Sequence, residues 1–191
     1  SPKFSFMKVL RVISHLEVGG VQRQLILIFR ALRELGVECS VCCIDKLGSL
    51  AEKFEEENFP VHQCRFSSRL NPKSLVRLRR LVKNEKFDVV HSHMYAANMS
   101  TNAALFGRRK VALVNGYHNQ IFYSGERQKK KVVRSANRPD AFVAVGENVR
   151  KALIEAGLPE KKIKTITNGV VGPDEPLPLP KPDPDGALRV M

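Results

Sequence analysis

The sequence has few of the features that mark membrane-spanning, disulfide-stabilised or metal-binding proteins. It contains no tryptophan, and no apolar run approaches the roughly 20 residues that a transmembrane helix needs. It shows no secretory signal and no cluster of metal ligands at a recognisable spacing. Only four cysteines are present, Cys39, Cys42, Cys43 and Cys64. Adjacent cysteines on a strand face opposite ways, so we expect free, buried thiols, which fits a reducing cytosol.

Acidic residues are also scarce, with 19 Asp and Glu against 32 Lys and Arg, and the formal net charge is +13. This excess of positive charge predicts an anionic partner, either nucleotide phosphates, nucleic acid or an anionic membrane surface. Many of the basic residues fall in two helix-like segments, 73–86 and 127–138. No aromatic pattern typical of RNA-binding modules accompanies them, so we do not expect a nucleic-acid partner. A solvated helix face is the alternative interpretation of both segments.

Seven short apolar segments are typical of strands and alternate with segments of helical periodicity. The strand-like segments are 8–14, 37–44, 59–64, 87–92, 111–115, 141–145 and 163–167. The helix-like segments are 21–35, 47–58, 72–86, 96–106, 127–137 and 147–157. This alternation predicts an α/β fold in which helices cover both faces of a doubly wound, parallel, seven-stranded, Rossmann-like sheet.

The domain organisation is expected to have four parts. Residues 7–170 form the Rossmann-like domain, and residues 1–6, which precede Met7, are interpreted as an added tag. The proline-rich segment 171–187 is interpreted as a linker, and residues 188–191 resemble the start of a strand in a further domain that the sequence does not contain.

Polar residues follow three of the predicted strands where ligands of open parallel sheets bind, outside the carboxyl ends. Gly19 and Gly20 lie between the first strand and the first helix, whose free backbone N–H groups and dipole favour an anion. The fourth strand ends in two histidines, of which His93 is the stronger candidate. His118 lies after the fifth strand and could hydrogen-bond a sugar hydroxyl or a phosphate. A tight turn without a ligand, and histidines that bond only neighbouring loops, remain the alternatives.

Five segments together resemble glycosyltransferase family 4, and they occur in that family's order and spacing. They are GGVQRQL (19–25), FDVVHSHMYAANM (87–99), NGYHN (115–119), DAFVAVGENVRKAL (140–153) and KIKTITNGV (162–170). The resemblance implies the N-terminal, acceptor-binding half of a GT-B fold, in which two Rossmann-like domains flank a cleft. It departs from the family pattern at Thr167, where proline is common, and at Gly146, where serine is common.

The resemblance implies a retaining transferase that moves a sugar from a nucleotide-sugar donor to a sugar or lipid-linked acceptor. Such enzymes usually use no metal or cofactor, and the nucleotide pocket would lie in the C-terminal domain that the sequence lacks. His118 matches the catalytic histidine. Gly19, Gly20 and Asn168 match positions near the donor phosphate or sugar. The residues expected to line the acceptor pocket are Gln22, Arg23, His93, Tyr95, Asn98 and Asn119.

Other function classes remain open at this stage. A nucleotide-sugar 2-epimerase would share the two-domain architecture, and a non-catalytic sugar- or lipid-binding module would bind an acceptor without turnover. A nicotinamide oxidoreductase is disfavoured because the loop after the first strand lacks the GxGxxG pattern. We expect a cytoplasmic protein, peripheral at the inner face of the membrane, that contributes to cell-envelope polysaccharide synthesis.

Overall fold

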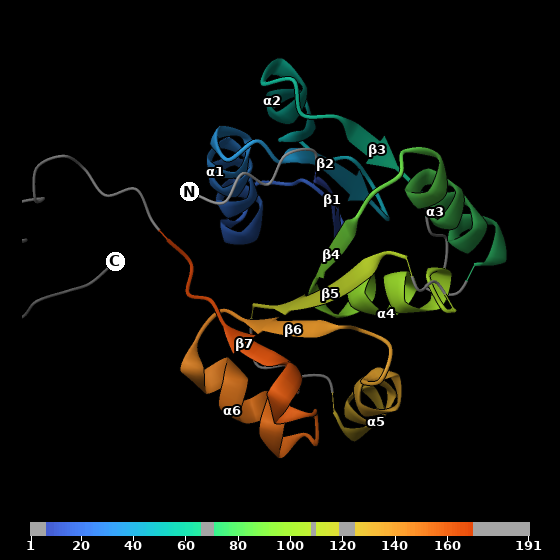
Figure 1. Ribbon diagram of the computed structural model, residues 1–191, viewed down its shortest axis with the longest axis vertical. Helices are drawn as coiled ribbons and strands as arrows, with labels where there is room; N and C mark the ends of the chain where they lie inside the picture. The colour runs from blue at the N-terminus through green and yellow to red at the C-terminus, as the bar shows by residue number, and fades with distance from the viewer. Residues whose placement is uncertain (1–6, 66–70, 108–109, 119–124, 170–191) are drawn as a thin grey trace, which may run out of the picture.

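The computed structural model describes residues 7–65, 71–107, 110–118 and 125–169, and it confirms the predicted fold. A seven-stranded sheet has the order β3-β2-β1-β4-β5-β6-β7, and every neighbouring pair is parallel (Figure 1). The strands are β1 Lys8–Ile13, β2 Glu38–Cys43, β3 Val61–Gln63, β4 Val89–His93, β5 Ala112–Tyr117, β6 Ala141–Ala144 and β7 Ile163–Thr165. The helices are α1 Gly20–Glu34, α2 Ala51–Glu56, α3 Pro72–Asn84, α4 Met94–Ala104, α5 Glu126–Ser135 and α6 Glu147–Glu155, with a 3₁₀ turn at Glu160–Lys162.

Each face of the sheet is covered by a different set of helices. Helices α1 and α2 pack on one face, here called the α1 face, against alternate residues of β1 such as Val9 and Ile13. Helices α3 and α4 pack on the other, the α4 face, against Leu10 and Val12. The two helix pairs lie on opposite sides of the strands in Figure 1. Successive residues of a strand therefore point into different cores, as the two-residue period of a strand requires.

The strand order reverses between β1 and β4, which are neighbours although about 80 residues separate them in sequence. The chain leaves β1 toward β2 in one direction and leaves β4 toward β5 in the other. In parallel α/β sheets the crevice formed at such a reversal, beyond the carboxyl ends of the strands, is the usual ligand position. The residues at the carboxyl ends of β1, β4 and β5 are therefore the first candidates for a ligand site.

Local sequence explains where several helices begin. The Asn71 side chain accepts hydrogen bonds from the backbone N–H groups of Lys73 and Ser74, at 3.0 and 3.4 Å, and Pro72 occupies the first turn of α3. Helix α4 begins directly after β4, two residues earlier than predicted. Met94 makes this abrupt change of direction with φ of 68°, a left-handed conformation that is uncommon for a side chain of its size.

Helix α2 is shorter than the predicted helix 47–58. The preceding residues instead form a loop that pairs with the segment after β1. Leu16 N–H donates to the Leu47 carbonyl at 2.6 Å, and Leu50 N–H donates to the Leu16 carbonyl at 2.8 Å. Gly48 makes this approach possible, because a Cβ atom there would lie 2.4 Å from the Leu16 backbone. The extended contact with Leu16 replaced the first helical turn that periodicity alone suggested.

The cysteine prediction is confirmed. All four cysteines are free and buried, and adjacent Cys42 and Cys43 point into the cores of opposite faces. No helix among the described residues is both long and apolar enough to cross a membrane. The expected tag at 1–6, the linker at 171–187 and the new strand at 188–191 lie outside the described residues.

Candidate functional site

Four nitrogen-rich side chains meet on the α1 face, where β1, β4 and β5 lie side by side. Arg11 of β1 pairs in register with His91 of β4, and His93 of β4 pairs with Gly116 of β5. Because alternate residues share a face, these side chains project to the same side as His118, which follows β5 directly. We call Arg11, His91, His93 and His118 the Arg–His cluster.

The members of the Arg–His cluster contact one another in a continuous chain. One guanidinium nitrogen of Arg11, Nη1, contacts His91 Nδ1 and lies 3.4 Å from His93 Nε2. The His91 and His93 rings stack, with centroids 4.3 Å apart and planes 20° from parallel. His93 Nδ1 lies 2.8 Å from His118 Nε2, within normal hydrogen-bond distance. The chain of contacts thus runs from the interior of β1 to the residue after β5.

The cluster contains a buried positive charge but no acidic group. Arg11 is 9% exposed, and within the described part of the chain it has no ion-pair partner. Burial lowers the pKa of Arg11 to about 10, so the guanidinium remains charged at neutral pH. Three buried nitrogens of the cluster lack any hydrogen-bond partner among the described residues, namely Arg11 Nε, His91 Nε2 and His118 Nδ1. An unpaired buried charge lowers stability, so such a cluster indicates a functional position.

The three histidines are held in the neutral form. Burial is the main cause, and it lowers the pKa of His118 to about 4, with the Arg11 charge as a second cause. The pKa values of His91 and His93 lie well below the ordinary value because of burial, with further lowering by neighbouring positive charge. At neutral pH each ring therefore carries one proton and offers one donor and one acceptor nitrogen.

Gly116 is needed for the packing of these rings. A Cβ atom there would lie 2.9 Å from His91 Nε2 and 3.2 Å from His93 Nδ1, and 3.3 Å from the Ser92 carbonyl oxygen. The first distance is shorter than real Cβ contacts, so glycine is the residue that admits both imidazoles beside β5.

A second polar cluster lies on the α4 face, behind the histidines. The hydroxyl of Ser92 is 2.7 Å from Asn98 Oδ1 and 3.0 Å from Asn115 Oδ1, and the Asn98 amide donates to the Gly116 carbonyl at 3.1 Å. We call Ser92, Asn98 and Asn115 the amide cluster. Each of the three is completely buried. These contacts tie the start of α4 to the ends of β4 and β5.

This arrangement gives Asn98 a structural role that sequence reasoning did not anticipate. Its side chain is occupied within the amide cluster and is on the α4 face, whereas the cluster that contains His93 lies on the α1 face. The expected contact of Asn98 with an acceptor stays a prediction.

The loop before α1 provides a second element of the site. Gly19 is extended, with φ of −172°, and precedes α1 with no side-chain cap and no acidic residue in the first turn. The first N–H groups of this 15-residue helix therefore remain available to an anion. Gln22 is buried and donates to the His15 carbonyl at 3.2 Å, which fixes the loop, whereas Gly20 and Arg23 are exposed.

The remaining predicted site residues are distributed around this edge. Tyr95, in the first turn of α4, is half-buried and lines a hollow against α5, together with Met99, Arg134 and Arg138. Asn168 is exposed after β7. Asn119 lies outside the described residues.

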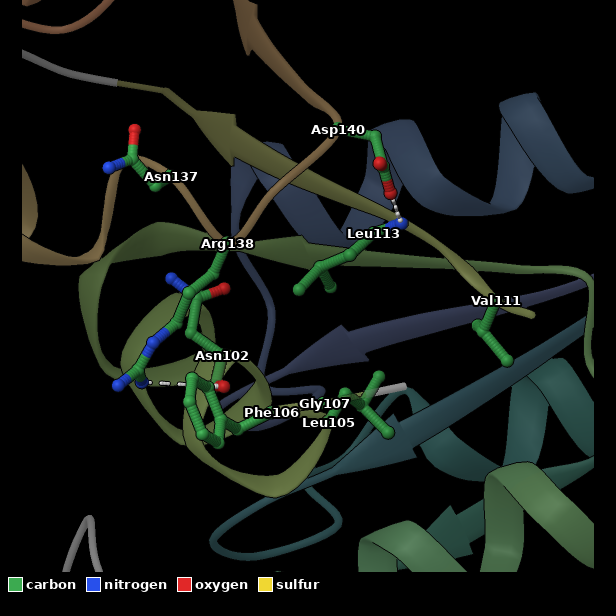
Figure 2. Close-up of a pocket in the computed structure, with 9 residues that line it drawn as sticks. All are labelled: Asn102, Leu105, Phe106, Gly107, Val111, Leu113, Asn137, Arg138 and Asp140. Carbon is green, nitrogen blue, oxygen red and sulfur yellow. Dashed lines mark hydrogen bonds between the residues drawn. The ribbon is translucent and has the colours of Figure 1, made fainter. Parts of the chain in front are cut away.

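A separate hollow of about 410 Å³ lies at the amino ends of β5 and β6, away from these groups (Figure 2). Two of its polar side chains, Asp140 and Arg138, already have partners. Asp140 accepts a hydrogen bond from the Leu113 backbone N–H at 2.8 Å (Figure 2). The Cζ atom of Arg138 lies 4.7 Å from the centre of the Phe106 ring, and Arg138 donates to the Asn102 carbonyl at 3.5 Å (Figure 2). We therefore do not assign it as the site. Across residues 7–65, 71–107, 110–118 and 125–169, no group of three His, Cys, Asp or Glu side chains is placed to hold a metal ion.

Sequence reasoning missed Arg11, the only permanently charged member of the Arg–His cluster. One signal was present, because Arg11 interrupts the otherwise apolar strand KVLRVI at a position that shares a face with Val9 and Ile13. A charged residue between two core residues is uncommon unless it has a specific role.

Comparisons with known proteins agree with this architecture. A search of curated proteins found no match. Among solved structures, HepE from Anabaena in complex with UDP and glucose superposes with a TM-score of 0.73 and 21% identity, covering 86% of this chain and 45% of HepE. The apo form of WaaB, a lipopolysaccharide outer core galactosyltransferase, gives a TM-score of 0.70 at 13% identity, covering 94% of this chain and 50% of WaaB.

The same fold also occurs in an enzyme of another reaction class. The UDP-GlcNAc 2-epimerase from Methanocaldococcus jannaschii superposes with a TM-score of 0.60 at 17% identity, covering 85% of this chain and 46% of the epimerase. The chain thus spans about half the length of each of these proteins, and its fold is that of GT-B N-terminal halves. The sequence model of Glycosyltransferase Family 4 matches residues 18–171, most of the chain, so this protein belongs to that family.

Proposed function

We propose that this chain is the acceptor-binding, N-terminal half of a retaining glycosyltransferase that uses a nucleotide-sugar donor. The observation that carries the proposal is the Arg–His cluster where β1, β4 and β5 lie side by side, in a chain of Glycosyltransferase Family 4. The cluster combines a fixed positive charge with neutral imidazoles, a combination suited to phosphate and sugar oxygens.

The donor would bind across the cleft between this chain and a second domain. The free N–H groups at the start of α1, beside Gly19 and Gly20, would face its phosphates, and an anion there gains about 0.3–1 kcal/mol from the helix dipole when exposed. His118 would contact the transferred sugar, and Asn168 would lie at the entrance to the second domain. HepE was solved with UDP and glucose, which supports a nucleotide sugar as the donor class.

The acceptor would bind on this half of the cleft, near Gln22, Arg23, His93 and Tyr95. We expect a sugar or a lipid-linked sugar of the cell envelope, handled by a cytoplasmic protein at the inner face of the membrane. Transfer would need no metal and no cofactor. WaaB, whose fold this chain shares, is a lipopolysaccharide outer core galactosyltransferase, which supports this class of acceptor.

The test uses a form of the protein that carries the second GT-B domain. It is incubated with a panel of nucleotide sugars, with and without lipid-linked and oligosaccharide acceptors, and the released nucleotide is measured. We expect acceptor-dependent release with at least one donor, and a product whose anomeric configuration matches that of the donor. Binding of acceptor without consumption of any donor would indicate a non-catalytic module instead.

A nucleotide-sugar 2-epimerase is the second candidate, because the Methanocaldococcus jannaschii epimerase shares the fold. An epimerase changes the donor without an acceptor, whereas a transferase requires one. NMR of the sugar after incubation with donor alone therefore separates the two. An inverted C2 centre without acceptor would replace the transferase proposal.

The 191-residue chain alone is expected to be inactive. Holding two reactants in the right geometry supplies roughly 7–11 kcal/mol of a barrier, and half a cleft cannot do so. We expect no detectable nucleotide-sugar binding by calorimetry to the chain alone, and recovery of binding when the second domain is present. Full-rate turnover by the chain alone would show that the donor site lies within it.

We propose that the basic segments 73–86 and 127–138 bring the protein to an anionic membrane or a phosphate-bearing lipid acceptor. Helix α3 covers most of the first segment. Its exposed residues include Lys73, Arg80 and Lys83. We expect co-sedimentation with vesicles of anionic phospholipid that weakens with salt, as the Debye length falls from about 10 Å at 0.1 M to about 3 Å at 1 M. Changing these three residues to Gln should weaken it, whereas changing the exposed acids of α2 (Glu52, Glu55 and Glu56) should not. Equal binding to neutral and anionic vesicles at low salt would refute this surface.

A further inference from the structure

The contacts in the Arg–His cluster fix which nitrogen of each histidine carries its proton. A guanidinium has donors only, so the nitrogens that face Arg11 Nη1 must be acceptors. His91 therefore accepts through Nδ1 and carries its proton on Nε2. His93 accepts through Nε2 and carries its proton on Nδ1.

The same logic extends one step further, to the residue beyond β5. The Nδ1–H of His93 points at His118 Nε2, 2.8 Å away, which must accept it. A neutral His118 then carries its proton on Nδ1. That nitrogen is buried and has no hydrogen-bond partner among the described residues. His118 thus offers an N–H donor and has no free lone pair for taking up a proton.

We propose that Arg11 is a positioning residue that sets the tautomer of His118 through His93, so that His118 acts as a hydrogen-bond donor to an oxygen of the bound nucleotide sugar and not as a general base. The role of the donor molecule rests on the function proposed above, whereas the tautomer chain does not. Arg11 lies in the interior of β1 and does not contact the substrate. It supplies the first N–H donor in the series of hydrogen bonds that leads to His118. The ligand chemistry that fits an Nδ1–H is a sugar hydroxyl oxygen or a phosphate oxygen.

Several features of the fold support a relay of this kind. Arg11 lacks an acid that would compete for its N–H groups within the described residues, so the histidines are the acceptors it meets. The stacked rings of His91 and His93 cannot turn freely, and Gly116 leaves no further space beside them. Burial of all three rings disfavours the doubly protonated form, which would break the chain of donors and acceptors.

The tautomers can be measured directly by long-range ¹H–¹⁵N NMR of the histidine rings in the 191-residue chain at pH 7, without any substrate. We expect Nδ1–H at His93 and His118 and Nε2–H at His91. In Arg11→Met, which removes the first donor, His118 should become a mixture of both tautomers. Arg11→Lys, which keeps a charge and a donor, should restore most of the Nδ1–H form.

Two further variants separate the relay from a general effect on folding. His93→Phe breaks the series of hydrogen bonds between Arg11 and His118 while Arg11 remains. His118 should again become a mixture of both tautomers. His91→Leu removes a histidine that contacts Arg11 but is not on the path to His118, so the His118 tautomer should not change. A wild-type His118 with its proton on Nε2 overturns the proposal even if no variant folds. Unchanged Nδ1–H in both Arg11→Met and His93→Phe also overturns it.

A kinetic experiment then connects the relay to turnover in the form with the second domain. Arg11→Met should lower kcat by about 10-fold or more while the KM for the donor changes little, and Arg11→Lys should recover part of the loss. A loss confined to KM would show that Arg11 serves binding only. If the tautomers are as expected but no nucleotide sugar is consumed, the relay stands and the proposed function fails.

Discussion

The two polar clusters lie on opposite faces of β4, where Ser92 stands between His91 and His93, and they differ in chemistry. The amide cluster, on the α4 face, consists of a hydroxyl and two amides that carry no charge at any ordinary pH. The Arg–His cluster, on the α1 face, contains a buried cation and three rings that can gain charge. One cluster joins α4 to the sheet, whereas the other keeps a buried charge without an acid.

A single strand, β4, thus contributes to a neutral cluster on one face and to a cluster with a buried charge on the other. Buried neutral groups that hydrogen-bond one another stabilise a fold modestly and define its geometry. A buried guanidinium without a carboxylate lowers stability, so its presence is explained by what it does to its neighbours.

The largest effect is expected for His118→Ala in the form that carries the second domain. Loss of one preorganised hydrogen-bond donor typically slows turnover by about 10²–10³-fold. Steady-state kinetics should therefore show a fall in kcat that exceeds the rise in the donor dissociation constant. His62→Ala is the matched control, because His62 lies on the edge strand β3, away from the cluster. Equal effects of the two changes would remove the special status of His118.

The pH dependence of unfolding should come from the Arg–His cluster. The pKa of His118 is about 4 in the folded chain against an ordinary value of 6.5, so the unfolded chain binds more protons between these values. Stability contributed by the neutral ring is complete above about pH 6.5 and is lost as pH falls toward 4. Each unit by which folding lowers the pKa corresponds to about 1.4 kcal/mol in the free energy of unfolding above pH 6.5.

This prediction can be checked by urea unfolding of the chain at a series of pH values from 7 to 4. His118→Asn, which cannot gain a proton, should make the profile less steep but not flat, because His91 and His93 also have lowered pKa values. A change within the amide cluster should shift the whole curve without changing its slope. A profile that is identical for wild type and His118→Asn would contradict the assigned cause.

Asn98→Ala should act on stability through the amide cluster. It leaves the Gly116 carbonyl without its side-chain donor and removes the nearer acceptor of the Ser92 hydroxyl, which keeps Asn115 Oδ1 at 3.0 Å. An unsatisfied buried group costs about 1–3 kcal/mol. We expect a loss of about 2–3 kcal/mol in the free energy of unfolding measured with urea. The exposed Asn84→Ala is the control and should change it by less than about 0.5 kcal/mol. If Asn98→Ala also raises the KM for the acceptor under strongly native conditions, Asn98 contacts the acceptor, as the sequence predicted.

Gly116→Ala should have the smallest effect and should fall on the Arg–His cluster alone. The new methyl group would lie 2.9 Å from His91 Nε2, so the imidazole must shift by a few tenths of an ångström. Overpacking of this size costs about 1 kcal/mol. We expect the ring NMR signals of His91 and His93 to move while those of the Asn98 and Asn115 amides stay in place. Movement of the amide signals instead would show that the two clusters are coupled.

Much of the fold could be predicted from the sequence because the pattern of neighbouring residues identifies each strand and helix. The spacing of apolar residues in α1 and the Asn71-Pro72 start of α3 depend only on near neighbours in the chain. The boundaries were harder to predict. Helix α2 begins later than predicted because residues before it form backbone hydrogen bonds with Leu16, and that contact is not local in the sequence. The strand-end histidines could be named as candidates from the sequence, but the residues that contact them could not, because those contacts are not local.

His91 and His93 share one side of β4 because the two-residue period of a strand places them there, and this follows from the sequence alone. The position of Arg11 beside them, and that of Asn98 on the other face, follow only from the assembled fold. Arg11 and His91 are 80 residues apart, and their contact depends on the order β1-β4, which forms when the whole sheet assembles. The direction of Asn98 depends on the abrupt turn at Met94, where packing against the sheet overrides the local preference of the residue.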